Sequence, residues 1–237
     1  MENRDSLEYL VNLGEKKEAI IKLDQGTFSR VSLNRVTEPV ASKLTVSTLT
    51  GLVDYIKTNV DKLEGKLLIQ VKSPEEVTLY SPLNADRERE KYVSAEAILP
   101  NNVVYDRFLD TERFNIMLQS AFVDDEDKSK LLKYTALITD DTVKNFGDDG
   151  ISQKVTVKTG VASVSDAVVP NPVTLAPFRT FPEVEQPESK FIFRMKEGPS
   201  AALFEADGGA WRNKAILNIK AYLEKELEHN HNVEIIA

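Results

Sequence analysis

Histidine is the first residue type to consider for chemistry, because it is the usual general base near neutral pH. The chain has two, His229 and His231, separated by Asn230. Two residues spaced two apart face different sides of a helix, so the pair does not converge on one site. The three letters also spell the name of a nuclease family, but that family spreads its histidine and asparagine residues over a ββα metal motif. An exposed terminus is therefore the expected setting of both histidines.

Nucleophilic catalysis has no support in the sequence. No Gly-x-Ser-x-Gly elbow occurs, and a Ser-His-Asp triad would need one of the two histidines brought to a serine from elsewhere. Cysteine is absent, which excludes disulfides, thiolate metal sites and cysteine nucleophiles together. We therefore assign no catalytic residue.

Paired acids are the next candidates, because carboxylates can hold Mg²⁺ for phosphoryl chemistry. Asp124-Asp125, Asp140-Asp141 and Asp148-Asp149 recur in the middle of the chain. Adjacent acids on a strand point to opposite faces, however, and aspartate is a common helix cap and turn former. We interpret Asp124 as a helix cap and Asp148-Asp149, which lies between two glycines, as a turn. No metal ligand and no cofactor is assigned.

Anion binding is a weaker alternative at Gly208-Gly209, which precede a predicted helix. The first amides of a helix can bind an anion, but the neighbouring Asp207 would repel one. A capping turn with Asp207 as the cap is the better interpretation.

Nucleic-acid binding is not favoured by the charge of the chain. The formal net charge is -8, whereas broad adhesion to nucleic acid needs clustered lysine and arginine. Cations alternate with aromatic residues at 87–92 and at 191–196, as in single-strand binders. Phe191 and Phe193 share one strand face, however, which is typical of a core. Direct nucleic-acid binding is not expected.

The length and composition predict an ordinary globular protein. The chain has 237 residues, of which 41% are hydrophobic and 29% charged, enough for a sizeable core in one large domain or two small ones. The first residues lack the basic patch and apolar run of a secretory signal. No apolar run approaches the ~20 residues that span a bilayer, so no membrane association is expected.

The elements that must position these residues follow from hydrophobic periodicity. In the first hundred residues the pattern predicts a short helix or turn and then strands, with one helix capped by Ser47 or Thr48. The predicted strands are 18–23, 29–36, 67–71, 77–80 and 92–99, and the predicted helix is 48–62.

The rest of the chain is first helical and then rich in strands. A helix is predicted after Thr111 and a second one from Asp124, with Leu131, Leu132 and Leu137 on one side. A turn at 147–150 follows. The later predictions are strands at 154–159, 190–196, 201–205 and 233–236, an extended proline-rich arm at 168–187, and a helix at 209–228.

This order of elements predicts an α+β fold: a mixed N-terminal part, a helical middle, and a β-rich C-terminal part closed by a long helix. The expected organisation is an N-terminal subdomain at 1–100, a helical segment at 101–146 and a C-terminal subdomain at 147–237.

Several segments together resemble one family, the YfdQ-like proteins of phages and prophages, especially the branch in Firmicute phages. The segments are TLTGLVDY (48–55), GDDGISQ (147–153), PNPV (170–173), APFRTFPEVEQP (176–187) and ALFEADGGAW (202–211). The proline-rich and EADGGAW stretches are the most specific to the family. The first ~45 residues carry little of the resemblance, a boundary that sequence patterns place only approximately. The resemblance brings no agreed activity and no catalytic residues. It implies a phage early-region setting near recombination and replication genes, and hence the cytoplasm of an infected bacterium.

The leading hypothesis is a non-enzymatic accessory protein that assembles with itself. The arm at 168–187 motivates it, because an extended arm with few local contacts often packs on a neighbouring subunit. One alternative is a host-defence antagonist that binds a host protein or sequesters a nucleotide signal. Another is a recombination or replication partner. On both alternatives a host or phage protein is an expected partner. The candidate assembly and binding residues are Pro177, Phe178, Arg179, Phe181, Pro182, Asp207 and Trp211.

Overall fold

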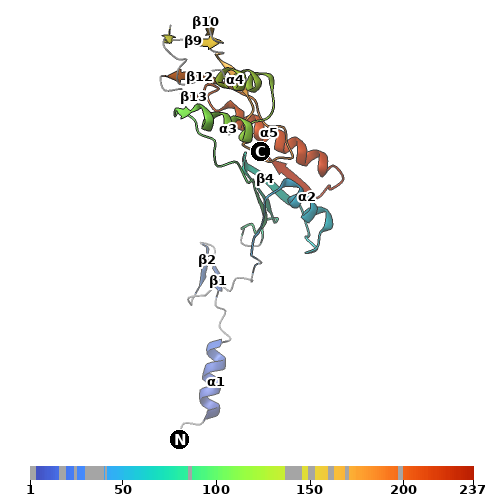
Figure 1. The fold of residues 1–237 in the computed structure, drawn as a ribbon. Helices are drawn as coiled ribbons and strands as arrows, with labels where there is room; N and C mark the ends of the chain where they lie inside the picture. Colours follow the sequence, from blue (N-terminus) through green and yellow to red (C-terminus); the bar gives the residue numbers. More distant parts are fainter. Residues whose placement is uncertain are drawn as a thin grey trace. The chain divides into compact units, whose positions relative to one another are not determined.

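The chain forms two compact units, residues 1–40 and 41–237. The computed structural model describes residues 4–15, 20–23, 26–29, 40, 42–84, 87–136, 146–148, 153–159, 163–168, 171–196 and 200–237. Most of the strand predicted at 29–36 lies outside these residues, as do Leu137, Asp140-Asp141 and Asp149. Figure 1 shows the course of the chain.

The small unit contains helix α1 (Arg4–Glu15) and an antiparallel hairpin of β1 (Ile20–Leu23) and β2 (Gly26–Ser29). The helix has apolar side chains at i, i+3 and i+4, namely Leu7, Leu10 and Val11, and all three are exposed. The short helix and the first strand that the sequence predicts are therefore present.

In its described residues the large unit contains three sheets, two of which pack with helices into its cores, and its class is α+β, as predicted. The first sheet has the strand order β14-β4-β5-β6-β3. Its inner pairs are antiparallel, whereas both edge strands pair in parallel. The strands are β3 (Leu44–Val46), β4 (Leu67–Ser73), β5 (Glu76–Tyr80), β6 (Lys91–Glu96) and β14 (Val233–Ile236). The C-terminal β14 thus completes a sheet made of residues from the first hundred, across the expected subdomain boundaries.

Helices α2 (Leu49–Thr58) and α5 (Ala210–Glu226) pack on one face of this sheet, as Figure 1 shows. The predicted cap of α2 is confirmed, because Thr48 Oγ1 accepts a hydrogen bond from the Gly51 amide at 3.1 Å. The helix ends earlier than the periodicity predicts, since Asn59 takes a left-handed conformation (φ 45°) and Val60 is exposed. The other face of the sheet carries polar side chains, among them the hydrogen-bonded pair Thr78 and Ser94.

The second sheet has the order β11-β12-β13-β7 and is antiparallel throughout. Helices α3 (Thr111–Ala121) and α4 (Glu126–Ala136) cover one face, which contains Phe191 and Phe193. The predicted pairing of 190–196 with 201–205 and the core position of both phenylalanines are confirmed. The strands are β7 (Leu109–Asp110), β11 (Val173–Leu175), β12 (Ser189–Lys196) and β13 (Ser200–Glu205).

The caps of α3 and α4 differ from the prediction by one residue each. Asp110, not Thr111, caps α3, because its Oδ1 accepts the Arg113 amide at 2.8 Å. Asp125, not Asp124, caps α4, because its Oδ1 accepts the Lys128 amide at 2.6 Å, while Asp124 pairs with the ammonium group of Lys128 at 2.7 Å. In both cases the sequence offers adjacent polar residues that can each cap, and local backbone geometry chooses between them.

A further antiparallel sheet consists of β8 (Phe146–Asp148), β9 (Gln153–Thr159) and β10 (Ser163–Val168). The strand predicted at 154–159 is confirmed. Gly147 and Asp148 pair with β9 and are strand residues, so the first half of the turn predicted at 147–150 is wrong, and residues 149 and 150 lie outside the described residues. Across the residues that the structure describes, no helix has the length and apolar character needed to cross a membrane.

Candidate binding site at Arg179

The proline-rich arm runs between the two cores of the large unit. Val173 and Leu175 belong to the core of the four-stranded sheet, and Phe181 and Val184 belong to the core of the five-stranded sheet. The amide of Phe178 donates to the Ala121 carbonyl at 2.9 Å, so the arm is also fixed to the end of α3. The arm therefore packs on its own chain, which differs from our expectation that it lies on a neighbouring subunit.

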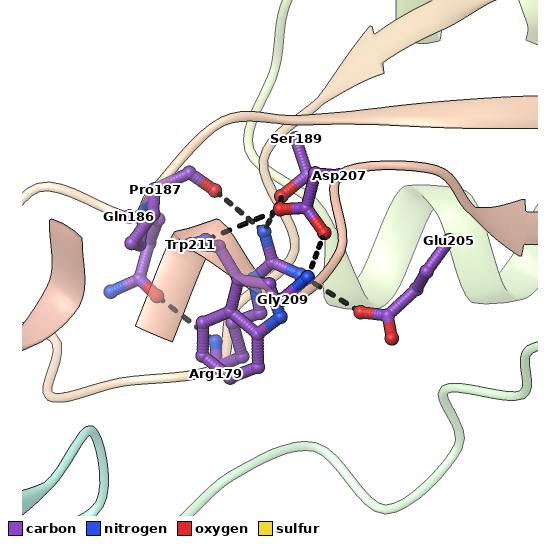
Figure 2. A network of polar contacts seen from close by, with 8 residues as sticks. All are labelled: Arg179, Gln186, Pro187, Ser189, Glu205, Asp207, Gly209 and Trp211. Carbon is purple, nitrogen blue, oxygen red and sulfur yellow. Dashed lines mark hydrogen bonds and ion pairs between the residues drawn. The ribbon is translucent and has the colours of Figure 1, made fainter. Parts of the chain in front are cut away.

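Arg179 lies in this arm with only 6% of its surface exposed. Nη1 donates to Glu205 Oε1 at 3.2 Å, and Nη2 donates to the Pro187 carbonyl at 3.1 Å and to Ser189 Oγ. Figure 2 shows these contacts around the guanidinium group. A buried charge is tolerated only when it is paired and hydrogen-bonded, and both conditions hold here.

Gln186 fixes the loop that holds Arg179. Its Oε1 accepts the amides of Arg179 and Thr180 at 3.0 and 3.2 Å, and its Nε2 donates to the Phe181 carbonyl at 3.0 Å. Thr180 Oγ1 also donates to the Pro74 carbonyl at 2.6 Å, which ties the loop to the β4–β5 turn. The position of the arginine is thus set by a closed network of hydrogen bonds.

Asp207 connects the arginine to the start of α5. One carboxylate oxygen accepts from Ser189 Oγ at 2.6 Å and from the Trp211 amide at 3.2 Å, and the other accepts from the Gly209 amide at 2.9 Å. Gly208 and Gly209 have φ of 63° and 81°, a conformation that strongly favours glycine. The predicted turn is therefore present and places Trp211 in the first turn of the helix, but Gly209, not Asp207, is the N-cap residue of α5.

Two guanidinium groups lie over the indole ring of Trp211. The Cζ atom of Arg179 is 4.0 Å from a ring centroid, and that of Arg212 is 4.7 Å away. Both distances are within the range of cation–π attraction. Figure 2 shows the Arg179 side chain behind the indole. Arg179 Nε and Trp211 Nε1 are buried and have no hydrogen-bond acceptor.

A cavity of about 260 Å³ opens beside this stack, and we call it the Arg179 pocket. One part of its lining is apolar and includes Leu99, Val103 and Phe178. The other part is polar and includes Tyr105 and Arg212. The complete lining is Glu75, Leu99, Pro100, Val103, Tyr105, Phe178, Arg179, Glu205, Trp211 and Arg212.

Three titratable groups of the site keep one charge state through neutral pH. Burial raises the pKa of Tyr105 to about 12, so the hydroxyl stays protonated. Burial lowers the pKa of Arg179, but a guanidinium group remains charged in proteins. Burial alone would raise the pKa of Asp207, but the hydrogen bonds from Ser189, Gly209 and Trp211 and the charge of Arg179 outweigh it and lower the pKa.

Comparisons with family models, curated proteins and solved structures found no match to this chain. The resemblance to the YfdQ-like family therefore remains a prediction, and function has to be inferred from the site itself.

The structure brings together most of the candidate residues that the sequence suggests. Phe178, Arg179 and Trp211 line the pocket, and Asp207 supports it through Ser189. Pro177 is buried and bridges to the end of α3, and Phe181 is fully buried in the core of the five-stranded sheet. Pro182 is exposed and does not line the pocket.

Sequence reasoning missed Tyr105, Gln186, Glu205 and Arg212. Glu205 is 26 residues from Arg179 in sequence, and no local pattern relates the two. Arg212 carried a usable signal, because it follows a tryptophan in the first turn of the predicted helix. Gln186 belongs to the specific proline-rich stretch but has no distinguishing neighbours.

The other chemical candidates lie elsewhere. His229 and His231 are exposed at the end of α5. Asp125 caps α4, and Asp124 pairs with Lys128 of the same helix. Among the residues that the structure describes, no group of three or more histidine, aspartate or glutamate side chains is arranged to hold a metal ion.

Proposed function

We propose that this chain is a non-enzymatic accessory protein, of the kind that phages encode, which acts by holding a ligand in the Arg179 pocket. The observation that carries the proposal is the composition of the pocket. Aromatic rings and guanidinium groups hold ligands, and the groups with shifted pKa values do not exchange protons near neutral pH. Such a site is suited to recognition.

The test is capture of a ligand from bacterial extract, read by native mass spectrometry of the intact chain. Val103→Trp fills the pocket from a lining residue that makes none of the hydrogen bonds of Arg179. Ile98→Trp is the matched control, because Ile98 is 79% exposed and does not line the pocket. We expect an added mass on the wild type and on Ile98→Trp, and its loss on Val103→Trp, with equal melting temperatures for the two variants. An added mass that survives in Val103→Trp would contradict the proposal.

Self-association is the second part of the proposed function, and α1 now supports it in place of the arm. The side chains of Leu7, Leu10 and Val11 are 54%, 64% and 58% exposed on one side of a helix. A helix of 12 residues is marginal in water by itself, so its stability depends on covering this apolar stripe. A second copy of α1 presents a matching stripe, and pairing between copies covers both.

Sedimentation velocity at micromolar concentration tests this part. We expect an oligomer for the wild type and a monomer for Leu10→Glu. Tyr9→Glu is the matched control, because Tyr9 is equally exposed (67%) but lies on the opposite side of the helix. A monomeric wild type would exclude self-association and leave the pocket proposal intact.

The two alternatives, a host-defence antagonist and a recombination or replication partner, remain predictions. Affinity purification from infected cells separates them, because the co-purifying molecule is a host defence protein or nucleotide in the first case and a recombination or replication protein in the second.

A further inference from the structure

Hydrogen-bond donors are in excess at the Arg179 pocket. Arg179 and Trp211 are both more than nine-tenths buried, and Arg179 Nε and Trp211 Nε1 have no acceptor. The Tyr105 hydroxyl and the Arg212 guanidinium also make no hydrogen bond or ion pair with a side chain that the structure describes. A buried donor without an acceptor is destabilising, so a ligand that supplies acceptors is favoured at this place.

From this surplus we propose that the ligand is a monocarboxylate with an apolar body. The inference rests on the proposed function, because it names the chemical class that the pocket holds. A carboxylate has two acceptor oxygens, and a guanidinium group binds it in a forked geometry.

The charges around the pocket favour one negative charge over two. The charge of Arg179 is balanced by Glu205 at 3.2 Å, which leaves Arg212 as the unpaired cation of the lining. Glu75 and Glu205 border the same cavity and would repel a second negative charge. A phosphate monoester carries nearly two charges at neutral pH and is therefore disfavoured.

The remaining walls select an apolar body of limited size. Leu99, Pro100, Val103 and Phe178 form this side of the lining. The volume of about 260 Å³ lies below the usual range for drug-sized ligands, so it suits a group the size of one amino acid. A free aliphatic or aromatic acid and the C-terminal residue of a peptide share this chemistry.

In the proposed complex, the ligand reaches the buried nitrogens past one exposed side chain of the lining. Arg212 lies over the indole and is exposed, so it can contact the carboxylate first and shift with it. In the proposed complex, a carboxylate oxygen then accepts a hydrogen bond from Trp211 Nε1, which has no acceptor in the protein. Arg179 stays in place, because it is held by Glu205, Pro187 and Ser189.

The fluorescence of Trp211 measures binding directly, because it is the single tryptophan of the chain. The probes are N-acetylphenylalanine and its neutral amide, titrated into the full-length protein. We expect saturable change with the acid and binding at least about tenfold weaker with the amide, since a hydrogen bond to a charged group contributes about 1.5–3 kcal/mol.

Variants assign the effect to the pocket. Arg212→Gln should weaken binding of the acid about tenfold by loss of its charged hydrogen bonds and leave the amide unchanged. Lys214→Gln removes the same charge from an exposed position on α5 that does not line the pocket, and it should bind like the wild type. Equal loss in both variants would overturn the assignment, because it would show a general effect of net charge.

Further titrations separate a peptide C-terminus from a small free acid, and they separate the carboxylate proposal from the proposal that the pocket holds a ligand. A tetrapeptide ending in phenylalanine that binds more tightly than the free acid would identify a peptide C-terminus as the source, and the reverse order would identify a small acid. Tighter binding of the amide, of inorganic phosphate or of adenosine monophosphate would overturn the carboxylate but keep a ligand in the pocket. No fluorescence change with any probe would also overturn the carboxylate, and the mass-spectrometric capture then decides the proposed function independently.

Discussion

The two halves of the large unit are packed with different side chains. The core between the five-stranded sheet and helices α2 and α5 is largely aliphatic, and among the residues that the structure describes its one fully buried aromatic ring is Phe181, which comes from the arm. The core between the four-stranded sheet and helices α3 and α4 is rich in rings and thioethers. Its members include Phe114, Phe122, Phe191, Phe193, Met117 and Met195.

Charges follow the same division. The two buried cations among the described residues, Lys128 and Arg179, both lie on the aromatic side. Lys128 donates to the Phe122 carbonyl at 2.8 Å, and the Cζ atom of Arg179 is 6.0 Å from the ring centroid of Phe191, while its nearer ring, Trp211, comes from α5. The ion pairs of the aliphatic half, such as Lys57 with Glu226, are at the surface.

This difference indicates a division of roles. Aliphatic packing gives the five-stranded half a rigid frame, while aromatic faces attract cations and allow charged groups to be held out of water. The Arg179 pocket lies where residues of both halves meet, with Glu75 and Leu99 from one side and Tyr105 and Glu205 from the other. The site therefore depends on the docking of the halves through the arm.

The largest expected effect tests whether the halves unfold together. Phe193→Ala in the aromatic core and Phe181→Ala in the arm should each lower the free energy of unfolding by about 3–5 kcal/mol, because each removes a fully buried ring. If the arm joins the halves into one cooperative unit, both variants shift a single transition in denaturant, followed by circular dichroism and by Trp211 fluorescence. Phe178→Ala, at a ring that is 39% exposed, is the control with a smaller loss. Two separate transitions in Phe181→Ala, but not in Phe193→Ala, would show that the halves unfold independently once the contact of the arm is lost.

The next effect concerns the buried charge. Arg179→Met should lower the free energy of unfolding by about 2–4 kcal/mol, because it leaves Glu205 and the Pro187 carbonyl without their donor; the value is below that of a fully buried pair since Glu205 is one-third exposed. Arg179→Lys keeps the charge but loses the fork, and should fall between the methionine variant and the wild type. Chemical unfolding at neutral pH measures all three. If Arg179→Met is as stable as the wild type, the buried charge of Arg179 contributes nothing to the free energy of unfolding.

A smaller effect depends on pH. The pKa of Asp207 is lower in the folded protein than in the unfolded chain, so ionisation of this carboxyl group favours folding. Its contribution is fully present above the unfolded pKa of about 3.9 and is lost as the pH falls through the folded value. Asp207→Asn should cost about 1 kcal/mol at pH 7, because the amide loses one acceptor oxygen and the attraction to Arg179, and it should be less destabilising relative to the wild type at low pH. Unfolding curves between pH 2 and pH 7 check this, and Ser189→Ala, which removes one of the hydrogen bonds, should show part of the effect. A cost that does not change with pH would contradict the assignment.

Much of the fold could be predicted from hydrophobic periodicity, because periodicity reports which side of an element is buried. The alternation at 190–196 and the stripe from Trp211 to Leu227 gave β12 and α5 nearly to the residue. The parallel pairing of β14 with β4 could not be predicted, since pairing between distant strands leaves no local trace. Apolar periodicity also does not fix where a helix ends. The pattern of α2 continues to Val60, but the helix ends at Thr58 because Asn59 takes a left-handed conformation.

The candidate site could be predicted only in part. Arg179 and Trp211 stand in the two most specific stretches of the sequence, and this singled them out. Their role as a buried stack did not follow, because an arginine is normally exposed and nothing in its neighbourhood indicates that Glu205 will pair with it. Tyr105 lies in an irregular segment before β7, where no periodicity exists to report burial.

The smallest expected effect comes from the aliphatic half. Lys57→Met removes an ion pair between α2 and α5 whose side chains are 44% and 36% exposed, and it should change the free energy of unfolding by less than about 1 kcal/mol. Screening by salt should shrink even this difference, so unfolding at 50 mM and at 1 M sodium chloride is the measurement. The contrast with Arg179→Met then isolates burial, because both variants replace one cation by the same apolar side chain. The comparison would fail if Lys57→Met lowered the free energy of unfolding as much as Arg179→Met, with no dependence on salt. The surface ion pair would then be needed to hold α2 against α5, and ion pairs would contribute equally to stability in both halves.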